Sequence, residues 1–193
     1  IGRGAFQDCT SLKSITIPES VNEIERYAFD GCTSLKNIII SEEVIRIRHR
    51  AFRGCTSLQS ITIPASVTMI GNEDEEDCFL FTGCTSLKNI VVAAGNPVYD
   101  SREDCNAIIK TKTNNLLYGC KSTIVPKSVK LIGAGAFSDC ASLKRIVIPK
   151  GVEGIDCMAF SGCSSLKSVT IPDSVTWIGQ DAFAGCTSLK SIT

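Results

Sequence analysis

One pattern recurs through nearly the whole chain. It reads Cys-x2-Leu-x2-Ile-x-Ile-Pro-x2-Val-x2-Ile-x3-Ala-Phe-x2-Cys, with a period of 23 residues. The period separates Cys9 from Cys32 and Cys55, and again Cys140 from Cys163 and Cys186. A repeat of this length is typical of one coil of a solenoid, in which each coil packs mainly on its two neighbours. The sequence therefore predicts a repeat solenoid.

Two insertions interrupt the repeat. Cys84 follows Cys55 by 29 residues, six more than one period, and the extra residues fall in an acidic loop at 71–79. Cys140 follows Cys84 by 56 residues, one coil plus 33 more, and this interval holds a predicted hairpin insertion at 93–120. We expect residues 1–193 to form a single solenoid domain. Both ends of the sequence fall inside a coil, so we expect a fragment of a longer protein.

Each coil is predicted to contain one short strand and one bend. Residues 13–17 alternate polar and apolar side chains, the pattern of a half-buried strand. Pro18 ends the strand because it has no N–H group to donate. We expect a short helical turn at the Ala-Phe pair that follows, as at Ala28-Phe29. One coil cannot offset the entropy of ordering its backbone, about 1–2 kcal/mol per residue, so neighbouring coils must stack with strands about 4.8 Å apart.

The segment from Ile171 to Leu189 carries a resemblance to a known family. It is similar, residue for residue, to the BspA-type leucine-rich repeat, which reads Ile-Pro-x-Ser-Val-x-x-Ile-Gly-x-x-Ala-Phe-x-Gly-Cys-x-Ser-Leu-x-x-Ile-x. The resemblance implies an α/β-type solenoid, a right-handed coil with a parallel β-sheet on its concave face and short helical turns. It also implies a cell-surface or secreted protein that adheres to host matrix proteins or other cells. The segment from Gly95 to Cys120 resembles a recurrent insertion in such proteins of gut and oral anaerobic bacteria.

The 11 cysteines fall into three groups. Seven occupy one position of the repeat, where we expect a column of buried free thiols facing inward, and the short Cys-x2-Cys spacing of a zinc site is absent from every coil. Cys105 and Cys120 lie opposite each other if the insertion is a hairpin turning at residues 112–113. Two interpretations stay open for this pair, a disulfide bond or two free thiols. Cys78 and Cys157 lie outside the repeated cysteine position, and the repeat does not explain them.

The sequence offers little for catalysis. His49 is the only histidine, so any nucleophile activated by histidine would depend on it. It lies in a bend before Ala51, where we expect a surface side chain. The Gly133-Ala-Gly135 segment lacks the lysine of a phosphate-binding loop. We therefore predict a protein that is not an enzyme and has no cofactor.

The acidic run at 73–77 does not have the alternating ligands and turn glycine of a calcium loop. One coil earlier lies a cluster of four arginines: Arg46, Arg48, Arg50 and Arg53. We expect charge pairs between this cluster and the acidic run, and no metal site.

Composition narrows the range of partners. The chain has 20 basic and 20 acidic residues, so no net charge attracts it to nucleic acid or to an anionic membrane. No apolar run approaches the roughly 18 residues that a membrane-spanning helix requires. We predict no nucleic-acid partner, no membrane insertion in this segment and a monomer.

Alignment of the coils predicts three exposed rows along the strands. The first holds lysine in seven of eight coils: Lys13, Lys36, Gln59, Lys88, Lys121, Lys144, Lys167 and Lys190. Small polar residues dominate the second row. The third places Val91, Ile124 and Val147 where other coils have threonine, and in a continuous stack these three would form an apolar patch. The lysine row is either a site for acidic protein segments or sulfated glycans, or a solvated row that keeps the sheet soluble.

The insertion at 93–120 carries apolar residues that include Tyr99 and Tyr118. We expect it either to fold over the apolar patch or to leave the patch bare for a partner, and we place binding specificity in it because loops that interrupt a solenoid are frequent binding sites. The predicted partner-binding residues are Lys36, Lys88, Lys121, Lys144, Lys167, Val91, Ile124, Val147, Tyr99 and Tyr118.

These observations predict a noncatalytic, extracellular interaction module that binds a protein or glycan, such as a host matrix or cell-surface protein. Two alternatives remain at this point. The chain is a structural spacer that presents another domain, or it is an intracellular protein–protein scaffold, which the many free cysteines would suit.

Overall fold

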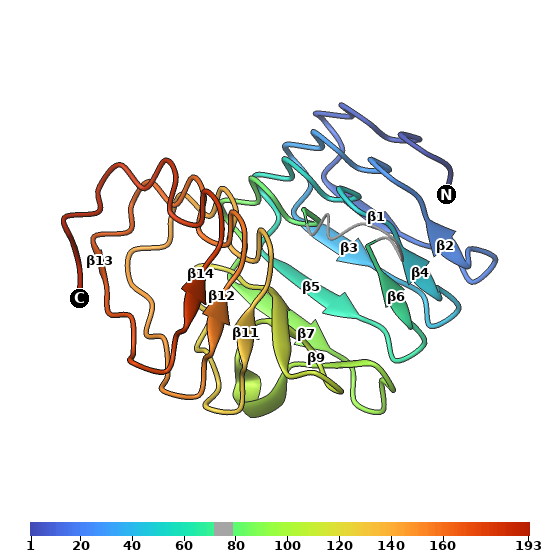
Figure 1. Cartoon of the computed structure of the whole chain (residues 1–193). Helices are drawn as coiled ribbons and strands as arrows, with labels where there is room; N and C mark the ends of the chain where they lie inside the picture. The colour runs from blue at the N-terminus through green and yellow to red at the C-terminus, as the bar shows by residue number, and fades with distance from the viewer. Residues whose placement is uncertain (72–78) are drawn as a thin grey trace.

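The computed structural model describes residues 1–71 and 79–193. The chain winds through a stack of similar coils that places the two termini at opposite ends (Figure 1). Most coils contribute two short strands, which we call the leading strand and the trailing strand in chain order. Neighbouring strands of one kind pair in parallel where they pair, so the predicted repeat fold with parallel strands is confirmed.

The leading strands occupy the segment that alternates polar and apolar residues. Ser14, Thr16 and their equivalents are exposed, whereas the residue between them points into the core, as the pattern predicts. Parallel pairs form between the first and second, the third and fourth, and the last two of these strands. The leading strands are β1 (Ser14–Thr16), β3 (Asn37–Ile39), β5 (Ser60–Ile63), β7 (Asn89–Val92), β13 (Ser168–Val169) and β15 (Ser191–Ile192).

The trailing strands form two separate ladders. In the N-terminal half, β2, β4 and β6 make a three-stranded parallel sheet. In the C-terminal half, β11, β12 and β14 belong to a six-stranded sheet with the order β14-β12-β11-β10-β9-β8. The trailing strands are β2 (Glu23–Ile24), β4 (Arg46–Ile47), β6 (Met69–Ile70), β11 (Leu131–Ile132), β12 (Gly154–Ile155) and β14 (Trp177–Ile178).

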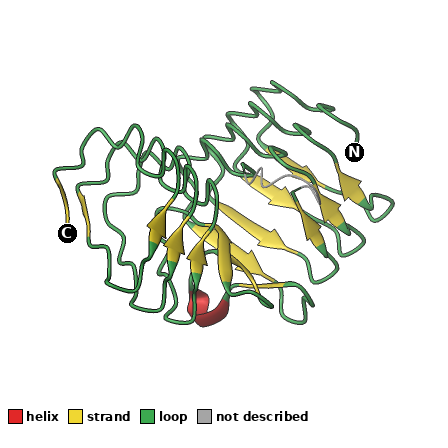
Figure 2. Cartoon of the chain, in the orientation of Figure 1, coloured by secondary structure: helices red, strands yellow, loops and turns green. Residues whose placement is uncertain are grey.

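The helical turns predicted at the Ala-Phe pairs are wrong. These segments are turns, and in the described part of the chain the only helix is the 3-10 helix η1 (Arg102–Asp104) (Figure 2). Two causes act together. Tyr27 and Arg50 adopt left-handed backbone angles just before Ala28 and Ala51, which interrupts any helix. The amide of Phe29 also donates to the carbonyl of Ala51 in the next coil, 2.8 Å away, and not to a residue four positions earlier.

Phenylalanine rings and cysteine thiols fill the interior in register. Phe29 stacks on Phe52 with ring centroids 5.6 Å apart, and Phe137 stacks on Phe160 at 5.0 Å. The predicted column of buried free thiols is confirmed at five of the seven repeat positions, whereas Cys9 is exposed and Cys186 is partly buried. Stacked phenylalanine rings therefore run from Phe6 to Phe81 in the N-terminal half and from Phe137 to Phe183 in the C-terminal half.

The insertion divides the core in two. Its strands β8 (Tyr99–Asp100), β9 (Ile108–Lys110) and β10 (Asn115–Tyr118) lie in the stack, where β10 pairs in parallel with β11. Ile108 belongs to the apolar cluster of the N-terminal half. Ile109 belongs to the cluster of the C-terminal half. The insertion thus lies inside the stack between the two halves.

Candidate interaction surface

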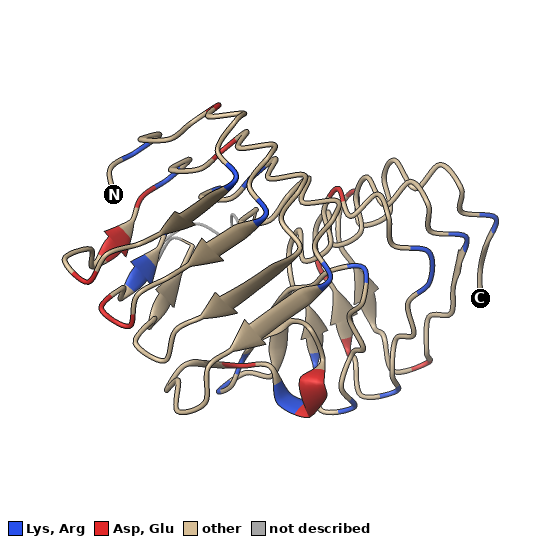
Figure 3. Cartoon of the chain, turned by 180° about the vertical axis from the view of Figure 1, so that it is seen from behind, with Lys and Arg blue, Asp and Glu red and all other residues tan. Residues whose placement is uncertain are grey.

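The lysine row runs along the beginning of the leading strands. All seven lysines and Gln59 are exposed. Backbone hydrogen bonds connect neighbouring members of the row: the amide of Lys36 donates to the carbonyl of Lys13 at 2.9 Å, and that of Lys190 donates to Lys167 at 3.0 Å. Figure 3 shows basic positions following one another across the coils on this side of the molecule. The row is therefore a line of positive charges that crosses the strands.

These lysines have no acidic partners in the described part of the chain. The ion pairs found there involve other basic residues, for example Lys130 with Glu153 at 2.6 Å and Arg53 with Asp30 at 3.5 Å. The second row beside the lysines is also exposed and consists of serine and asparagine, except for Arg145. The ammonium groups of the row thus remain available to a ligand.

The apolar residues of the third row are exposed. Val91 is 46% exposed, Ile124 70% and Val147 81%, and Ile39 on β3 is 64% exposed. Ile39 belongs to the same row and extends it into the N-terminal half. The insertion does not fold over these side chains, so that expectation is wrong, and the exposed face of the leading strands carries aliphatic side chains beside the lysine row.

The row of apolar residues is not carried on one continuous ladder. Val92 at the end of β7 donates its amide to the hydroxyl of Ser101 at 3.0 Å, and the amide of Ile124 donates to the carbonyl of Cys105 at 3.1 Å. Residues 101–105 of the insertion therefore contact both β7 and the next coil. One apolar patch was predicted only for an uninterrupted stack. Because the insertion lies between Val91 and Ile124, these two residues do not belong to one continuous patch.

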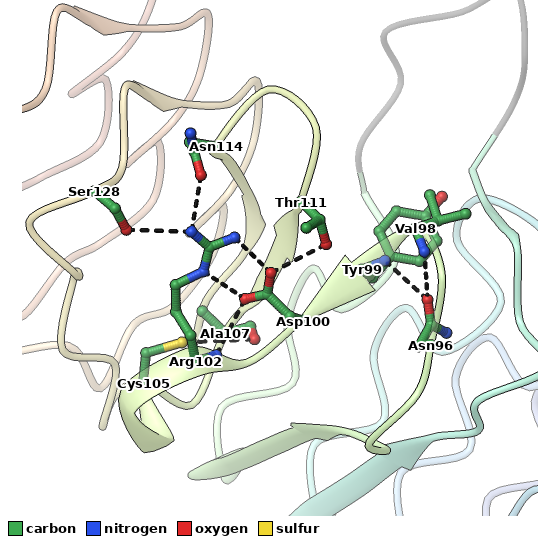
Figure 4. Close-up of polar contacts among 10 residues, drawn as sticks. All are labelled: Asn96, Val98, Tyr99, Asp100, Arg102, Cys105, Ala107, Thr111, Asn114 and Ser128. Atoms are coloured by element: carbon green, nitrogen blue, oxygen red, sulfur yellow. Dashed lines mark hydrogen bonds and ion pairs between the residues drawn. The ribbon is translucent and has the colours of Figure 1, made fainter.

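A polar network anchors the insertion (Figure 4). Arg102 forms an ion pair with Asp100 and donates to the side-chain oxygen of Asn114 at 2.8 Å. Burial favours the neutral acid at Asp100, but hydrogen bonds from Arg102 and Thr111 outweigh it and hold the pKa of Asp100 below its ordinary value. This network was not among the sequence predictions, although the Asp-x-Arg spacing in an insertion was a usable signal.

Tyr99 and Tyr118, predicted to contact a partner, are buried at 6% and 2% exposure. The hydroxyl of Tyr99 accepts a hydrogen bond from the amide of Ile70 at 3.0 Å. The ring of Tyr118 packs edge-on against Phe81 at 5.7 Å. Both tyrosines face the core because the insertion lies within the stack, so the interaction surface does not include them.

The hairpin register explains the state of the two cysteines in the insertion. Asn115 lies opposite Lys110 and Leu116 opposite Ile109, but a bulge then places Tyr118 opposite Ile108. The bulge shifts the register that would bring Cys105 opposite Cys120. Both cysteines are free buried thiols, and burial raises the pKa of Cys105 to about 11. The disulfide interpretation is therefore wrong for this structure.

His49 is buried, not on the surface as predicted, and its ring meets that of Tyr27 edge-on at 5.9 Å. Among the arginines of the same coil, Arg48 forms an ion pair with Glu23, and Arg50 donates to the hydroxyl of Tyr27 at 3.0 Å. The acidic run at 73–77 and Cys78 lie outside the described residues, so the predicted pairing with these arginines stays a prediction.

Comparison with known proteins identifies the repeat. The family described as "BspA type leucine rich repeat region" matches residues 1–96 and 109–193 in six copies. The chain belongs to the BspA-type leucine-rich repeat family. The expected resemblance is thus confirmed, and the unmatched residues 97–108 fall within the insertion. No curated protein matches the sequence significantly.

Solved structures of other leucine-rich repeat proteins are similar to this BspA-type chain. A leucine-rich cell surface protein of Faecalibacterium prausnitzii is 27% identical, with a TM-score of 0.53 over 98% of this chain and 61% of its own. The pneumococcal vaccine antigen PcpA is 25% identical, with a TM-score of 0.71 over 94% of this chain and 50% of its own. The leucine-rich repeat protein of T. pallidum is 32% identical, with a TM-score of 0.55 over 99% of this chain and 71% of its own. The chain thus spans 61% and 50% of the first two structures.

None of these relatives is described as an enzyme. No helix within residues 1–71 and 79–193 has the length and apolar character needed to cross a bilayer.

Proposed function

We propose that this BspA-type solenoid is a noncatalytic interaction module, secreted or on the cell surface, that binds a protein or glycan in adhesion to host matrix or other cells. The binding surface is the exposed face of the leading strands, which we take as the concave face of a right-handed coil. The relative named as a cell surface protein supports the location.

The observation that carries this proposal is the exposure of Ile124 and Val147 at 70% and 81%. Other coils place Thr16, Thr62 or Thr170 at this position of the repeat. The fold therefore accepts a polar residue there, and the aliphatic side chains are not needed for packing. Exposed aliphatic groups beside an unpaired row of lysines suit a surface that a partner covers.

A double substitution tests the proposal. In Ile124→Thr with Val147→Thr, each residue becomes the one that other coils carry, so the fold should keep its stability. We expect beads coated with this variant to lose at least about tenfold in adhesion to immobilised matrix proteins, equivalent to about 1.4 kcal/mol. The matched control is Ile45→Thr, which changes a 41% exposed aliphatic residue outside the leading strands. Equal adhesion of the double variant and the control would contradict the proposal.

The spacer alternative predicts a different result, namely that the parent chain adheres to none of the immobilised proteins or glycans.

Deletion of residues 95–119 cannot distinguish an interaction module from a structural spacer. It would remove Ile108 and Ile109 from the two cores and so destabilise the module itself.

A further inference from the structure

The spacing of the lysine row restricts the kind of ligand that can follow it. The amide of Lys167 donates to the carbonyl of Lys144 at 3.4 Å, and Lys190 is bonded to Lys167 in the same way at 3.0 Å. One lysine therefore follows another at each coil, a step of about 4.8 Å between paired strands. The row advances across the strands, along the axis of the solenoid.

A linear polyanion with one charge per step of this length matches the row. A sugar residue in a linear polysaccharide advances the chain by a similar step and can carry a sulfate or carboxylate on each ring. An extended acidic peptide fits less well, because side chains on one face of it recur every second residue, or about 6.7 Å. Its carboxylates would fall out of phase with the lysines after two coils.

The neighbouring row suits a sugar as well. Ser168 and Ser191 follow Lys167 and Lys190 directly and are exposed, so their hydroxyl groups can donate to and accept from sugar hydroxyls. Neither row contains an acidic residue in any coil. Lysine ammonium groups are flexible point charges that do not demand the fixed planar geometry of arginine, which favours anions of varied orientation.

Within the first two rows, positive charge is densest in the C-terminal half. Lys144, Lys167 and Lys190 occupy three successive coils, and Arg145 adds a fourth charge in the second row. In the N-terminal half the row is interrupted by Gln59, whose carbonyl accepts the amide of Lys88 at 3.0 Å. A ligand that binds one charge per coil meets three successive lysines in the C-terminal half, whereas Gln59 limits the first run of the N-terminal half to Lys13 and Lys36.

We propose that the lysine row binds a linear sulfated or carboxylated polysaccharide that lies across the leading strands, with its main contacts at Lys144, Lys167 and Lys190. This inference rests on the proposed interaction face and specifies its ligand class. The exposed aliphatic side chains of the third row lie on the same face and can contact the edge of the sugar chain.

Binding of a heparin decasaccharide to the full chain tests the proposal. We expect the triple variant K144Q/K167Q/K190Q to bind at least about tenfold more weakly and with less dependence on salt. The matched control K112Q/K127Q/K150Q removes the same charge from three exposed lysines outside the row and should change the affinity less than about twofold. Equal loss in both variants, or no loss in the row variant, would overturn the proposal.

A gain of affinity provides a second test. Gln59→Lys completes the row in the N-terminal half, and we expect it to bind a sulfated oligosaccharide that spans several coils about twofold to fivefold more tightly. Thr68→Lys adds the same charge to an exposed position of the same coil outside the row and should have no such effect. Equal gains from both substitutions would indicate unspecific attraction and overturn the proposal.

Polyglutamate separates this inference from the proposed function. If polyglutamate binds with the same sensitivity to the row variant and the sulfated oligosaccharide does not bind, the polysaccharide assignment is overturned while the interaction face stands. If neither probe binds, the polysaccharide assignment is again overturned, and the Ile124 and Val147 adhesion experiment decides the proposed function independently.

Discussion

The thiol of Cys163 donates a hydrogen bond to the carbonyl oxygen of Phe137 in the preceding coil, with a sulfur–oxygen distance of 3.2 Å. The same contact joins Cys186 to Phe160 at 3.2 Å. These carbonyls also accept backbone amides, from Cys140 at 3.0 Å and Cys163 at 3.1 Å. The repeated cysteine therefore does more than fill space, because its thiol adds a second hydrogen bond that joins neighbouring coils.

Removal of one buried thiol should weaken the stack. We expect Cys163→Ala to lower the free energy of unfolding by about 1–3 kcal/mol, because the carbonyl of Phe137 loses one of its two donors and a small cavity remains. Denaturant titration measures the change. Cys9→Ala, at an exposed position of the same column, should stay within about 0.5 kcal/mol of the parent. Equal losses of unfolding free energy in the two variants would show that a buried thiol of the column stabilises the fold no more than an exposed one.

The column should also resist thiol reagents. Burial raises the pKa of Cys32 and of Cys140 to about 12. Because the thiolate is the reactive form, both should react with iodoacetamide at about pH 8 far more slowly than the exposed Cys9, as mass spectrometry of peptides can measure. Rapid labelling of Cys140 in the folded chain would contradict this burial.

The raised thiol pKa values should also make the stability of the fold depend on alkaline pH. A thiol whose folded pKa lies above its unfolded value stabilises the fold fully below the unfolded pKa, about 8.5. That contribution is lost as the pH rises from there toward about 12, the folded pKa of Cys32 and Cys140. We expect the melting temperature to fall over this range, and to fall less in Cys140→Ala. An unchanged alkaline slope in that variant would contradict the assignment.

The Asp100–Arg102 pair should make the insertion sensitive to acid. Because the folded pKa of Asp100 is lowered, its contribution is present above the unfolded pKa, about 3.9, and is lost as the pH falls through the lower folded pKa. We expect Asp100→Asn to be less stable than the parent at neutral pH and nearly equal to it in strong acid. The exposed Asp173→Asn serves as control. A stability difference that does not shrink in acid would contradict the role of the pair.

Adjacent residues of the insertion should stabilise different halves of the molecule. Ile108 and Ile109 are both fully buried but belong to separate apolar clusters. Each change to alanine should cost about 2–5 kcal/mol. Hydrogen exchange should rise mainly in β4 and β6 for Ile108→Ala, and mainly in β11 and β12 for Ile109→Ala. The same exchange pattern in both variants would indicate one undivided core.

The regular coils could be predicted from the sequence because their local and long-range signals agree. In β1, the alternation of Ser14, Ile15 and Thr16 specifies both the strand and its buried side. The constant period then places each residue beside its equivalent one coil away, which is why the lysine row could be located from the sequence alone.

The insertion and the bends could not be predicted in the same way. Ile108 and Ile109 are consecutive apolar residues, which is typical of a strand buried on both faces, yet the insertion was expected either to cover the apolar patch or to leave it bare for a partner. The left-handed conformation of Tyr27 and Arg50 has no glycine to signal it. Those residues are held by bonds between coils, which a single coil of sequence does not contain.

A footprint of the lysines on binding gives the sharpest test of the proposed binding surface. The full chain would be acetylated with and without a bound partner, and the modification of each lysine measured by mass spectrometry. We predict protection of Lys144 and Lys167 in the lysine row, with no change at Lys112, Lys127 and Lys150. Continued acetylation of Lys144 and Lys167, together with protection of Lys112, Lys127 and Lys150, would contradict the assignment of the binding surface.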